Sequence, residues 1–285
     1  MRKLLPLLIA ILMYSSAIKA QKQVFANDEL TITQLEDKMW VIETVDNTTM
    51  YIIEGDEKAM LIDTGTDCHN LQEVVKKITD KPLYVVITHI HVDHAGNIFD
   101  FEDIYFHQAD EVLIDRLREP YKGRIHYVKD GDVFDLGNKE IEVKHMPGHT
   151  PGSIVLLDYQ TGNCYSGDAF GSGQVWCQLW PFSSMHTYEK SCRTMHKLMN
   201  NGITKVYCGH YPHIKRAFDK SYIEDMSQLA AMIRKGTQPE PKPHPFIIPV
   251  IGAAKPMMST YKTATIVYDP EHVKKGLKGE VSPGN

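Results

Sequence analysis

Short apolar runs separated by turn-forming residues recur along most of the chain, and they predict a protein rich in β-strands. The runs contain mainly valine, isoleucine, leucine and tyrosine, with glycine, asparagine or aspartate between many of them, as is typical of strands joined by turns. The run at 83–89, LYVVITH, begins with an unbroken apolar stretch, which indicates a strand buried on both faces. The predicted strands cover 39–44, 49–55, 58–65, 83–89, 139–146, 153–159, 162–168 and 205–210, with 263–270 as a candidate final strand.

Four other segments repeat apolar residues every three or four positions, which is the spacing of an amphipathic helix. The last two end near Gly202 and Gly236, and glycine commonly ends a helix. Strands dominate each half of the chain and helices follow them, so we expect a layered α/β protein with two stacked sheets and outer helices. The predicted helices cover 68–79, 108–119, 187–202 and 221–236.

The two ends of the chain depart from this pattern. Residues 1–20 have a basic start, a mostly apolar run and small residues before Ala20, which predicts a secretory signal peptide with an apolar run too short to span a bilayer comfortably. An uncleaved membrane anchor is the alternative. We expect a single domain over 21–285, periplasmic or secreted, with no stable membrane span after cleavage. Its residues from about 237 to 285 begin with a proline-rich stretch and form a C-terminal extension.

Composition and charge indicate a soluble globular protein and argue against one that binds nucleic acid. The 285 residues are 42% hydrophobic and 24% charged, which is ordinary for a soluble globular protein. Removal of Arg2, Lys3 and Lys19 with the signal peptide changes the net charge from −5 to −8. No block of five basic residues is present, so the sequence predicts no nucleic-acid partner. We expect a small-molecule substrate, and the sequence leaves the oligomeric state open.

The five cysteines do not indicate a disulfide framework, because their number is odd and their spacing is irregular. Cys164 and Cys208 lie in apolar strand-like runs, where we expect them to pack in the core. Cys177 and Cys192 are a possible disulfide pair if the protein is exported.

The richest chemistry in the sequence lies at 87–97, ITHIHVDHAGN. It places His89, His91, Asp93 and His94 within six residues, directly after a buried strand. Histidine nitrogen and carboxylate oxygen together suit zinc and some iron sites. A solvent-exposed histidine-rich loop is the alternative interpretation, but this density of ligand-type residues at a strand end favours a metal site.

Three more ligand-type residues follow predicted strands downstream. His149 lies in MPGHTPGS, Asp168 in YSGDAF and His210 in CGHYP, each close to a glycine that allows the backbone to approach a neighbour closely. Each residue alone is compatible with an ordinary turn. Together with the first cluster, they predict that four strand-end loops converge with seven ligand-type side chains.

With these motifs in order, the chain resembles the metallo-β-lactamase superfamily of hydrolases. The resemblance rests on LIDTG at 61–65, THIHVDHAGN, PGHTPGS, SGD and CGH, and it covers the mature chain to about His213. It implies an αββα sandwich, with two packed mixed sheets and helices on the outside.

The resemblance also implies a set of metal ligands and two zinc ions per chain, with iron as a possible replacement. One metal is assigned to His89, His91 and His149, the other to Asp93, His94 and His210, and Asp168 bridges the two. Asp63 in LIDTG resembles the family's acid behind the metal centre, where a carboxylate can fix a histidine tautomer. A simple turn-forming role before Gly65 is its alternative. Asp93 and Asp63 are the predicted catalytic residues.

The implied activity is hydrolysis by an exported dinuclear zinc enzyme. A hydroxide shared by two metals would attack the carbonyl of an ester, lactone, thioester or amide, and Asp93 would orient it. Aspartate at position 168 resembles the glyoxalase-II-type thioesterases and lactonases, whereas the zinc β-lactamases of the superfamily generally place cysteine or serine there. The alternatives are a β-lactamase acting on β-lactams and an iron-dependent oxidoreductase similar to the persulfide dioxygenases.

The segment 169–186, AFGSGQVWCQLWPFSSMH, is unusually aromatic and follows a predicted ligand. We expect it to form an apolar wall for a neutral, partly apolar substrate, although aromatic packing on the body of the protein or a dimer contact is the alternative. The predicted substrate contacts are Phe170, Trp176, Trp180 and, directly after His210, Tyr211.

Overall fold

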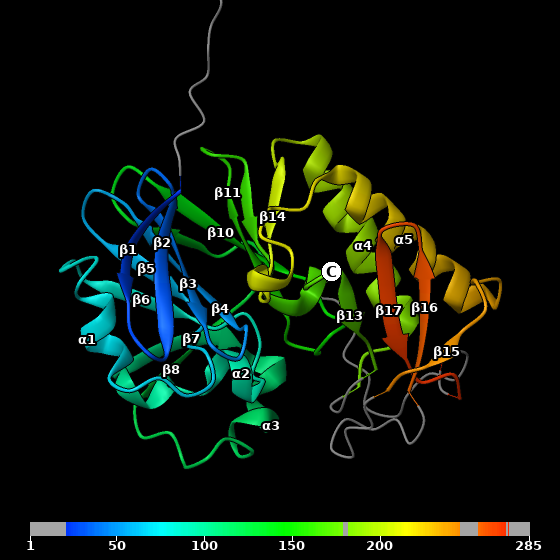
Figure 1. The fold of residues 1–285 in the computed structure, drawn as a ribbon, viewed down its shortest axis with the longest axis horizontal. Helices are drawn as coiled ribbons and strands as arrows, with labels where there is room; N and C mark the ends of the chain where they lie inside the picture. The colour runs from blue at the N-terminus through cyan, green and yellow to red at the C-terminus, as the bar shows by residue number, and fades with distance from the viewer. Residues whose placement is uncertain (1–20, 179–181, 246–255, 272, 274–285) are drawn as a thin grey trace, which may run out of the picture.

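The computed structural model describes residues 21–178, 182–245, 256–271 and 273, and Figure 1 shows how these parts are arranged. The predicted signal peptide and Trp180 lie outside the described residues. Within them, no helix is both long enough and apolar enough to cross a membrane.

The first half of the chain forms an eight-stranded mixed sheet whose strands follow one another in chain order. Strands β1 to β5 are antiparallel neighbours, and β5 to β8 are parallel to one another. Strands β1, β2, β7 and β8 add to the predicted set. The bounds are β1 Lys22–Ala26, β2 Leu30–Glu36, β3 Met39–Thr44, β4 Thr49–Glu54, β5 Ala59–Ile62, β6 Leu83–Val86, β7 Asp103–His107 and β8 Arg124–Val128.

The second sheet has five strands in the order β14-β12-β11-β10-β9. Strands β9 to β12 are antiparallel, and β14 joins β12 in parallel. This sheet is therefore mixed as well. The bounds are β9 Val133–Asp135, β10 Glu140–His145, β11 Ile154–Asp158, β12 Asn163–Tyr165 and β14 Lys205–Tyr207.

A third, smaller sheet corrects the expectation of two sheets alone. Its order is β13-β17-β16-β15. Strand β17, at the position of the candidate final strand, runs parallel to β13, so the C-terminal extension pairs with the aromatic segment after Asp168. The bounds are β13 Gln174–Trp176, β15 Lys242–Pro243, β16 Met257–Tyr261 and β17 Ala264–Tyr268.

Two long helices, α4 (Met185–Asn200) and α5 (Lys220–Lys235), lie against each other over the second sheet (Figure 1). Asp219 caps α5 by accepting hydrogen bonds from the first turn, and the helix ends at Gly236 as predicted. The predicted helices 68–79 and 108–119 are shorter than expected, because after α1 and α3 the chain continues in turns whose N–H groups donate three residues back. The short helices are α1 Leu71–Val75, α2 Val92–Ala95, α3 Glu111–Ile114 and the 3-10 turns Ile98–Asp100, Gln108–Asp110, Gly167–Phe170 and Tyr211–His213.

Three buried apolar clusters show how the layers pack. One joins inward residues of both large sheets, such as Ile53 and Leu156. The second lies between the first sheet and helices α1 to α3, and the third lies between the second sheet, α4, α5 and the small sheet. Strands with both faces covered explain runs such as β11, in which every residue is buried. The predicted αββα sandwich is confirmed.

All five cysteines are buried free thiols. Cys177 and Cys192 pack in the third cluster together with Cys164 and Cys208. The possible disulfide between Cys177 and Cys192 is therefore absent, and these residues serve as small apolar side chains.

Candidate metal centre

The predicted ligands converge because their loops leave neighbouring strand ends. In the parallel pair of β12 and β14, Tyr165 is in register with Tyr207. Asp168 and His210 each follow three residues later, so the register brings them to the same edge of the sheet. Gly209 is required there, because a Cβ atom on it would lie 2.5 Å from a carbon of the His94 ring and 2.6 Å from Asp168 Oδ1.

His89, His91 and His149 form one cluster, here called the three-histidine group. The ring centroids of His89 lie 4.8 Å from His91 and 4.7 Å from His149, in edge-to-face geometry. Nδ1 of His91 is 3.0 Å from Nε2 of His149. Two loops supply the group, the one after β6 and the one between β10 and β11.

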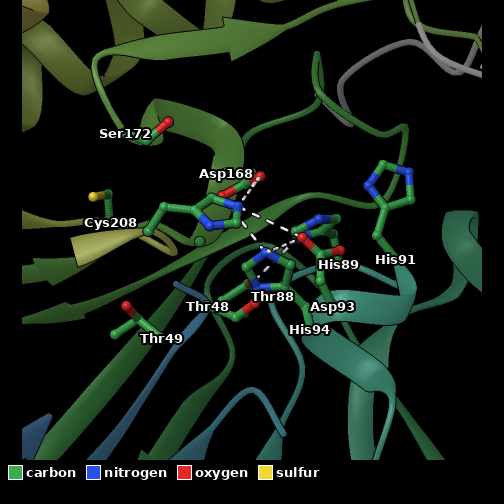
Figure 2. A network of polar contacts seen from close by, with 12 residues as sticks. Thr48, Thr49, Thr88, His89, His91, Asp93, His94, Asp168, Ser172 and Cys208 are labelled. Atoms are coloured by element: carbon green, nitrogen blue, oxygen red, sulfur yellow. Dashed lines mark hydrogen bonds and ion pairs between the residues drawn. The ribbon is translucent and has the colours of Figure 1, made fainter. Parts of the chain in front are cut away.

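Asp93, His94, Asp168 and His210 form the second cluster, here called the mixed group. His94 Nε2 lies 3.6 Å from a carboxylate oxygen of Asp93 and 3.6 Å from one of Asp168. His210 Nε2 lies 3.2 Å from Asp168 Oδ2. Figure 2 shows the side chains of His89, Asp93, His94 and Asp168 gathered around a common centre.

Asp168 connects the two groups. Its Oδ2 atom lies 3.2 Å from His210 Nε2 and 3.7 Å from Nε2 of His149 in the three-histidine group. This position between the groups is the one that a bridging carboxylate requires.

The donor sets fit metal ions. Within each group, the candidate ligand atoms lie within 4.8 Å of one another, and imidazole nitrogen with carboxylate oxygen is a donor set that zinc accepts. In the described part of the chain, His89 Nε2, His94 Nε2 and Asp168 Oδ1 are buried without a hydrogen-bond partner. Unpaired buried polar atoms are costly. A cation in the three-histidine group would satisfy His89, and a cation in the mixed group would satisfy His94 and Asp168.

Electrostatics differ between the groups. Burial lowers the pKa of His89, His91 and His149, and the neighbouring histidines contribute to the first two shifts. These rings are therefore neutral at pH 7, which is the form that binds a metal.

The histidines of the mixed group face carboxylates instead. Burial opposes their charge, but Asp93, Asp168 and Asp63 raise the pKa of His94 to about 10. Asp168 likewise outweighs burial and raises the pKa of His210 to about 9. Burial disfavours a charged Asp168, yet His210 and His94 hold its pKa well below the usual range.

Asp63 lies behind the mixed group and fixes the orientation of His94. Its Oδ2 atom accepts a hydrogen bond from His94 Nδ1 at 2.8 Å, so that Nε2 of this ring faces the ligand cluster. The backbone N–H and hydroxyl of Thr88 donate to the same carboxylate at 2.7 and 2.9 Å. These contacts support the predicted tautomer-fixing role, and they make Asp63 a positioning residue rather than a group that touches the substrate.

Backbone carbonyls orient two more ligands. These carbonyl contacts cannot be predicted from sequence motifs, because any residue type provides a carbonyl group. His149 Nδ1 donates to the carbonyl of Trp176 at 2.8 Å, and His210 Nδ1 donates to the carbonyl of Asn47 at 3.1 Å. Each contact directs Nε2 of the ring toward the cluster. Thr88 was also missed, although it stands inside the THIH motif.

The predicted substrate contacts differ in burial and in the part of the fold where they lie. Phe170 is 0% exposed and packs in the core beside Tyr188, so its predicted contact with substrate is wrong: the turn after Asp168 points this ring inward. Tyr211 is 3% exposed in the core between the large sheets, and its hydroxyl accepts a hydrogen bond from Gln21. Trp176 is half-buried, with its ring 4.4 Å from that of His244. Contacts of Tyr211 and Trp176 with substrate stay predictions.

Comparisons with known proteins agree with this geometry. Residues 44–210 match the family model described as the metallo-beta-lactamase superfamily. Human acyl-coenzyme A thioesterase MBLAC2 is 28% identical over 209 residues, covering 59% of this chain and 75% of the relative. Hydroxyacylglutathione hydrolase GloC from Haemophilus influenzae is 24% identical over 177 residues, covering 56% of this chain and 83% of the relative.

Solved structures show the same fold. The metallo-beta-lactamase FIM-1 from Pseudomonas aeruginosa, in its mono-zinc form, superposes with a TM-score of 0.58 at 18% identity. The superposition covers 74% of this chain and 97% of FIM-1.

Proposed function

Since the chain belongs to the metallo-β-lactamase superfamily, we propose that it is an exported dinuclear zinc hydrolase that cleaves thioesters. The observation that carries the proposal is the pair of ligand groups joined by Asp168. A single catalytic zinc needs about three protein ligands, and seven are gathered here.

The residues of the chain divide the work between them. The three-histidine group would hold one zinc, the mixed group would hold the other, and Asp168 would contact both. Zinc, when bound, lowers the pKa of water and polarises a carbonyl group. The Asp93 side chain is the more solvent-accessible carboxylate, 35% exposed against 16% for Asp168. It is therefore placed to orient the attacking water and to accept its proton.

Two observations favour a thioester among the possible ester, lactone, thioester and amide substrates. Two relatives are named as an acyl-coenzyme A thioesterase and a hydroxyacylglutathione hydrolase, and both names denote enzymes that act on thioesters. Position 168 holds aspartate, whereas cysteine or serine is usual in the zinc β-lactamases.

Metal analysis and a substrate panel test the proposal. Protein purified without added metal should contain about two zinc ions per chain by elemental analysis. A panel of an acyl-coenzyme A, a hydroxyacylglutathione, a lactone and a β-lactam should show the highest kcat/KM for a thioester. A single iron without zinc would overturn the dinuclear hydrolase in favour of an oxidoreductase, and faster β-lactam turnover would overturn the substrate class.

Export is part of the proposal and is supported by the layout of residues 1–20. Protein recovered from its native host should begin at Gln21 when its intact mass is measured. A mass that includes Met1 on a cytosolic species would overturn this part.

A further inference from the structure

A buried carboxylate outside the ligand set, Asp110, ties together the two loops that supply the three-histidine group. Its Oδ2 atom accepts hydrogen bonds from the N–H of Ile90 at 3.1 Å and from the hydroxyl of Thr150 at 2.7 Å. Its Oδ1 atom accepts from the N–H of Gly152 at 2.6 Å. Ile90 stands between His89 and His91 in the chain, and Thr150 directly follows His149. We propose that Asp110 is a positioning residue that sets the geometry of the three-histidine group.

The fit between Asp110 and the second loop is close. A Cβ atom on Gly152 would lie 2.5 Å from Cγ of Asp110 and 2.6 Å from its Oδ1, so no other residue fits at this position without displacing the carboxylate. The hydroxyl of Ser153 lies 2.8 Å from that of Thr150 and also accepts from the Thr150 N–H. Because the single hydroxyl proton of Thr150 is donated to Asp110, Ser153 is the donor between the two hydroxyls.

The side chain of Asp110 does not cap the helix that begins next to it. It occupies the N-cap position of α3, where aspartate usually accepts a hydrogen bond from the first helical turn, but its side chain makes no capping bond. It is 0% exposed, and its three hydrogen-bond donors are neutral groups of the two ligand loops. A buried carboxylate with only neutral partners is costly, and here its three hydrogen bonds all go to those loops.

Protonation leaves this role intact at neutral pH. Burial raises the pKa of Asp110 to about 6, while the hydrogen bonds from Thr150, Ile90 and Gly152 hold it down. The carboxylate is therefore mainly charged at pH 7 and accepts from all three donors.

The effect is specific to one ligand group. Two of the residues that contact Asp110, Ile90 and Thr150, are chain neighbours of three-histidine ligands. The third, Gly152, lies in the same turn as His149. The acid behind the mixed group is Asp63, which contacts His94. A backbone hydrogen bond from the N–H of Ile154, the first residue of β11, to the carbonyl of Thr88 also joins the two ligand segments, and the contacts of Asp110 add to that link.

Zinc titration of the metal-free protein tests the proposal, which rests on the zinc binding assigned under the proposed function. Competition with a chromophoric chelator gives two zinc dissociation constants, and His149→Ala identifies the one that belongs to the three-histidine group. Asp110→Asn should raise that constant about 10- to 100-fold, as loss of a ligand-orienting contact typically does. The constant of the mixed group should stay within about threefold of wild type, because Asp63 is untouched.

Asp158→Asn is the matched control. Asp158 is 1% exposed and accepts from Lys139 and from the N–H groups of Gln160 and Thr161, at the end of β11 remote from the ligand loops. It should lower stability and leave both zinc constants unchanged. Wild-type zinc binding in Asp110→Asn, equal weakening of both sites, or the same pattern in the control would each overturn the proposal.

Thr150 gives a milder second test if Asp110→Asn fails to fold. Thr150→Val removes the hydroxyl donor at similar size and should weaken the three-histidine zinc about tenfold, while Thr150→Ser keeps the donor and should restore binding. Equal binding by the two variants would contradict the proposal. Wild-type protein that binds no zinc would overturn the proposed function itself, whereas two bound zinc ions with no effect of Asp110→Asn would overturn the positioning role alone.

Discussion

The two ligand groups lie side by side, yet the fold prepares them in opposite ways. Burial keeps the rings of the three-histidine group neutral. The Trp176 carbonyl orients His149, and hydrogen bonds to Asp110 hold the two loops that carry the group. The mixed group is a cluster of charges, in which carboxylates raise the pKa of His94 to about 10 and of His210 to about 9.

This difference has a chemical consequence. Apart from the shared Asp168 carboxylate, the three-histidine group offers only neutral donors, so a cation bound there would keep more of its charge and is suited to polarise a carbonyl. The mixed group adds two carboxylates, which lower the net charge of a bound cation and leave Asp93 at the solvent side for proton transfer. Asp168 belongs to both environments, because it lies close to histidines of each group.

The largest effect is expected for Asp168→Ala, because its carboxylate lies close to the Nε2 atoms of histidines in both groups. Zinc occupancy should fall at both sites, and kcat/KM on the preferred thioester should fall at least about 1000-fold, about 4 kcal/mol in activation free energy. Elemental analysis and steady-state kinetics measure the two effects, with Asp158→Ala as the control. Full occupancy with intact activity would show that Asp168 does not bridge.

The sequence predicted the seven ligands because each follows an apolar strand in a short loop with a distinctive residue type. The role of Asp63 was implied by the resemblance of LIDTG to the superfamily motif, with a turn-forming role as the alternative. Asp110 was missed because a single aspartate inside a segment with helical periodicity has no local signal. Its role depends on two loops that are 20 and 40 residues away.

Other parts of the fold depend on pairings that local patterns do not encode. Strand β13 is three residues long and forms through its pairing with β17, almost a hundred residues later. The aromatic residues of this segment are separated, because Phe170 ends the turn after Asp168 and packs into the core, whereas Trp176 lies in β13 and stays half-buried. An aromatic-rich segment therefore predicts burial of its rings but not which ring faces a substrate.

Asp63→Asn should weaken zinc binding mainly at the mixed group. Asp63 has a positive φ of 62°, which asparagine tolerates, so the backbone should be kept. An amide N–H facing His94 Nδ1 would favour the tautomer with its proton on Nε2, the atom needed for the metal. The zinc constant of the mixed group should rise about 10- to 100-fold. That of the three-histidine group should rise less, because Asp63 reaches it only through the Thr88 hydroxyl, which lies 3.2 Å from His89 Nδ1.

Asp110→Asn should give the reverse result, so the two variants form a crossed experiment in one titration. Equal responses of both sites to both variants would mean that the groups are a single cooperative unit, and the distinction between them would be wrong.

A smaller effect is expected at the substrate wall next to the three-histidine group. Trp176→Ala should lower kcat/KM about 5- to 30-fold, about 1–2 kcal/mol for lost apolar contacts, mainly through KM. Zinc binding should persist, because His149 donates to the Trp176 backbone carbonyl. Phe170→Leu is the matched core variant and should lower the free energy of unfolding by about 1 kcal/mol without changing KM. A Trp176 variant with normal kinetics and a large loss of Tm would assign that ring to the core as well.

The smallest effect concerns acid and the loop of His149. His107 stacks on His145, with ring centroids 3.9 Å apart, and His145 donates to the carbonyl of Pro151 in that loop. Burial and the neighbouring His145 lower the pKa of His107 to about 4, while Asp130 partly opposes the shift. A folded-state pKa below the unfolded value of about 6.5 means that the unfolded chain binds more protons between pH 6.5 and 4. His107 therefore destabilises the fold progressively as pH falls through this window.

His107→Asn should reduce this sensitivity to acid. The Nδ1 atom of His107 accepts from the N–H of Ala109, and an asparagine oxygen can accept the same bond two residues along the chain, but it does not titrate. Urea unfolding of metal-free protein at pH 7 and pH 5 should show that the wild type loses about 1 kcal/mol more than the variant over this interval. His186→Asn, at a side chain that is 54% exposed, should leave the interval unchanged. An identical loss in wild type and His107→Asn would mean that the stacked pair does not couple acid to the stability of the loop behind the three-histidine group.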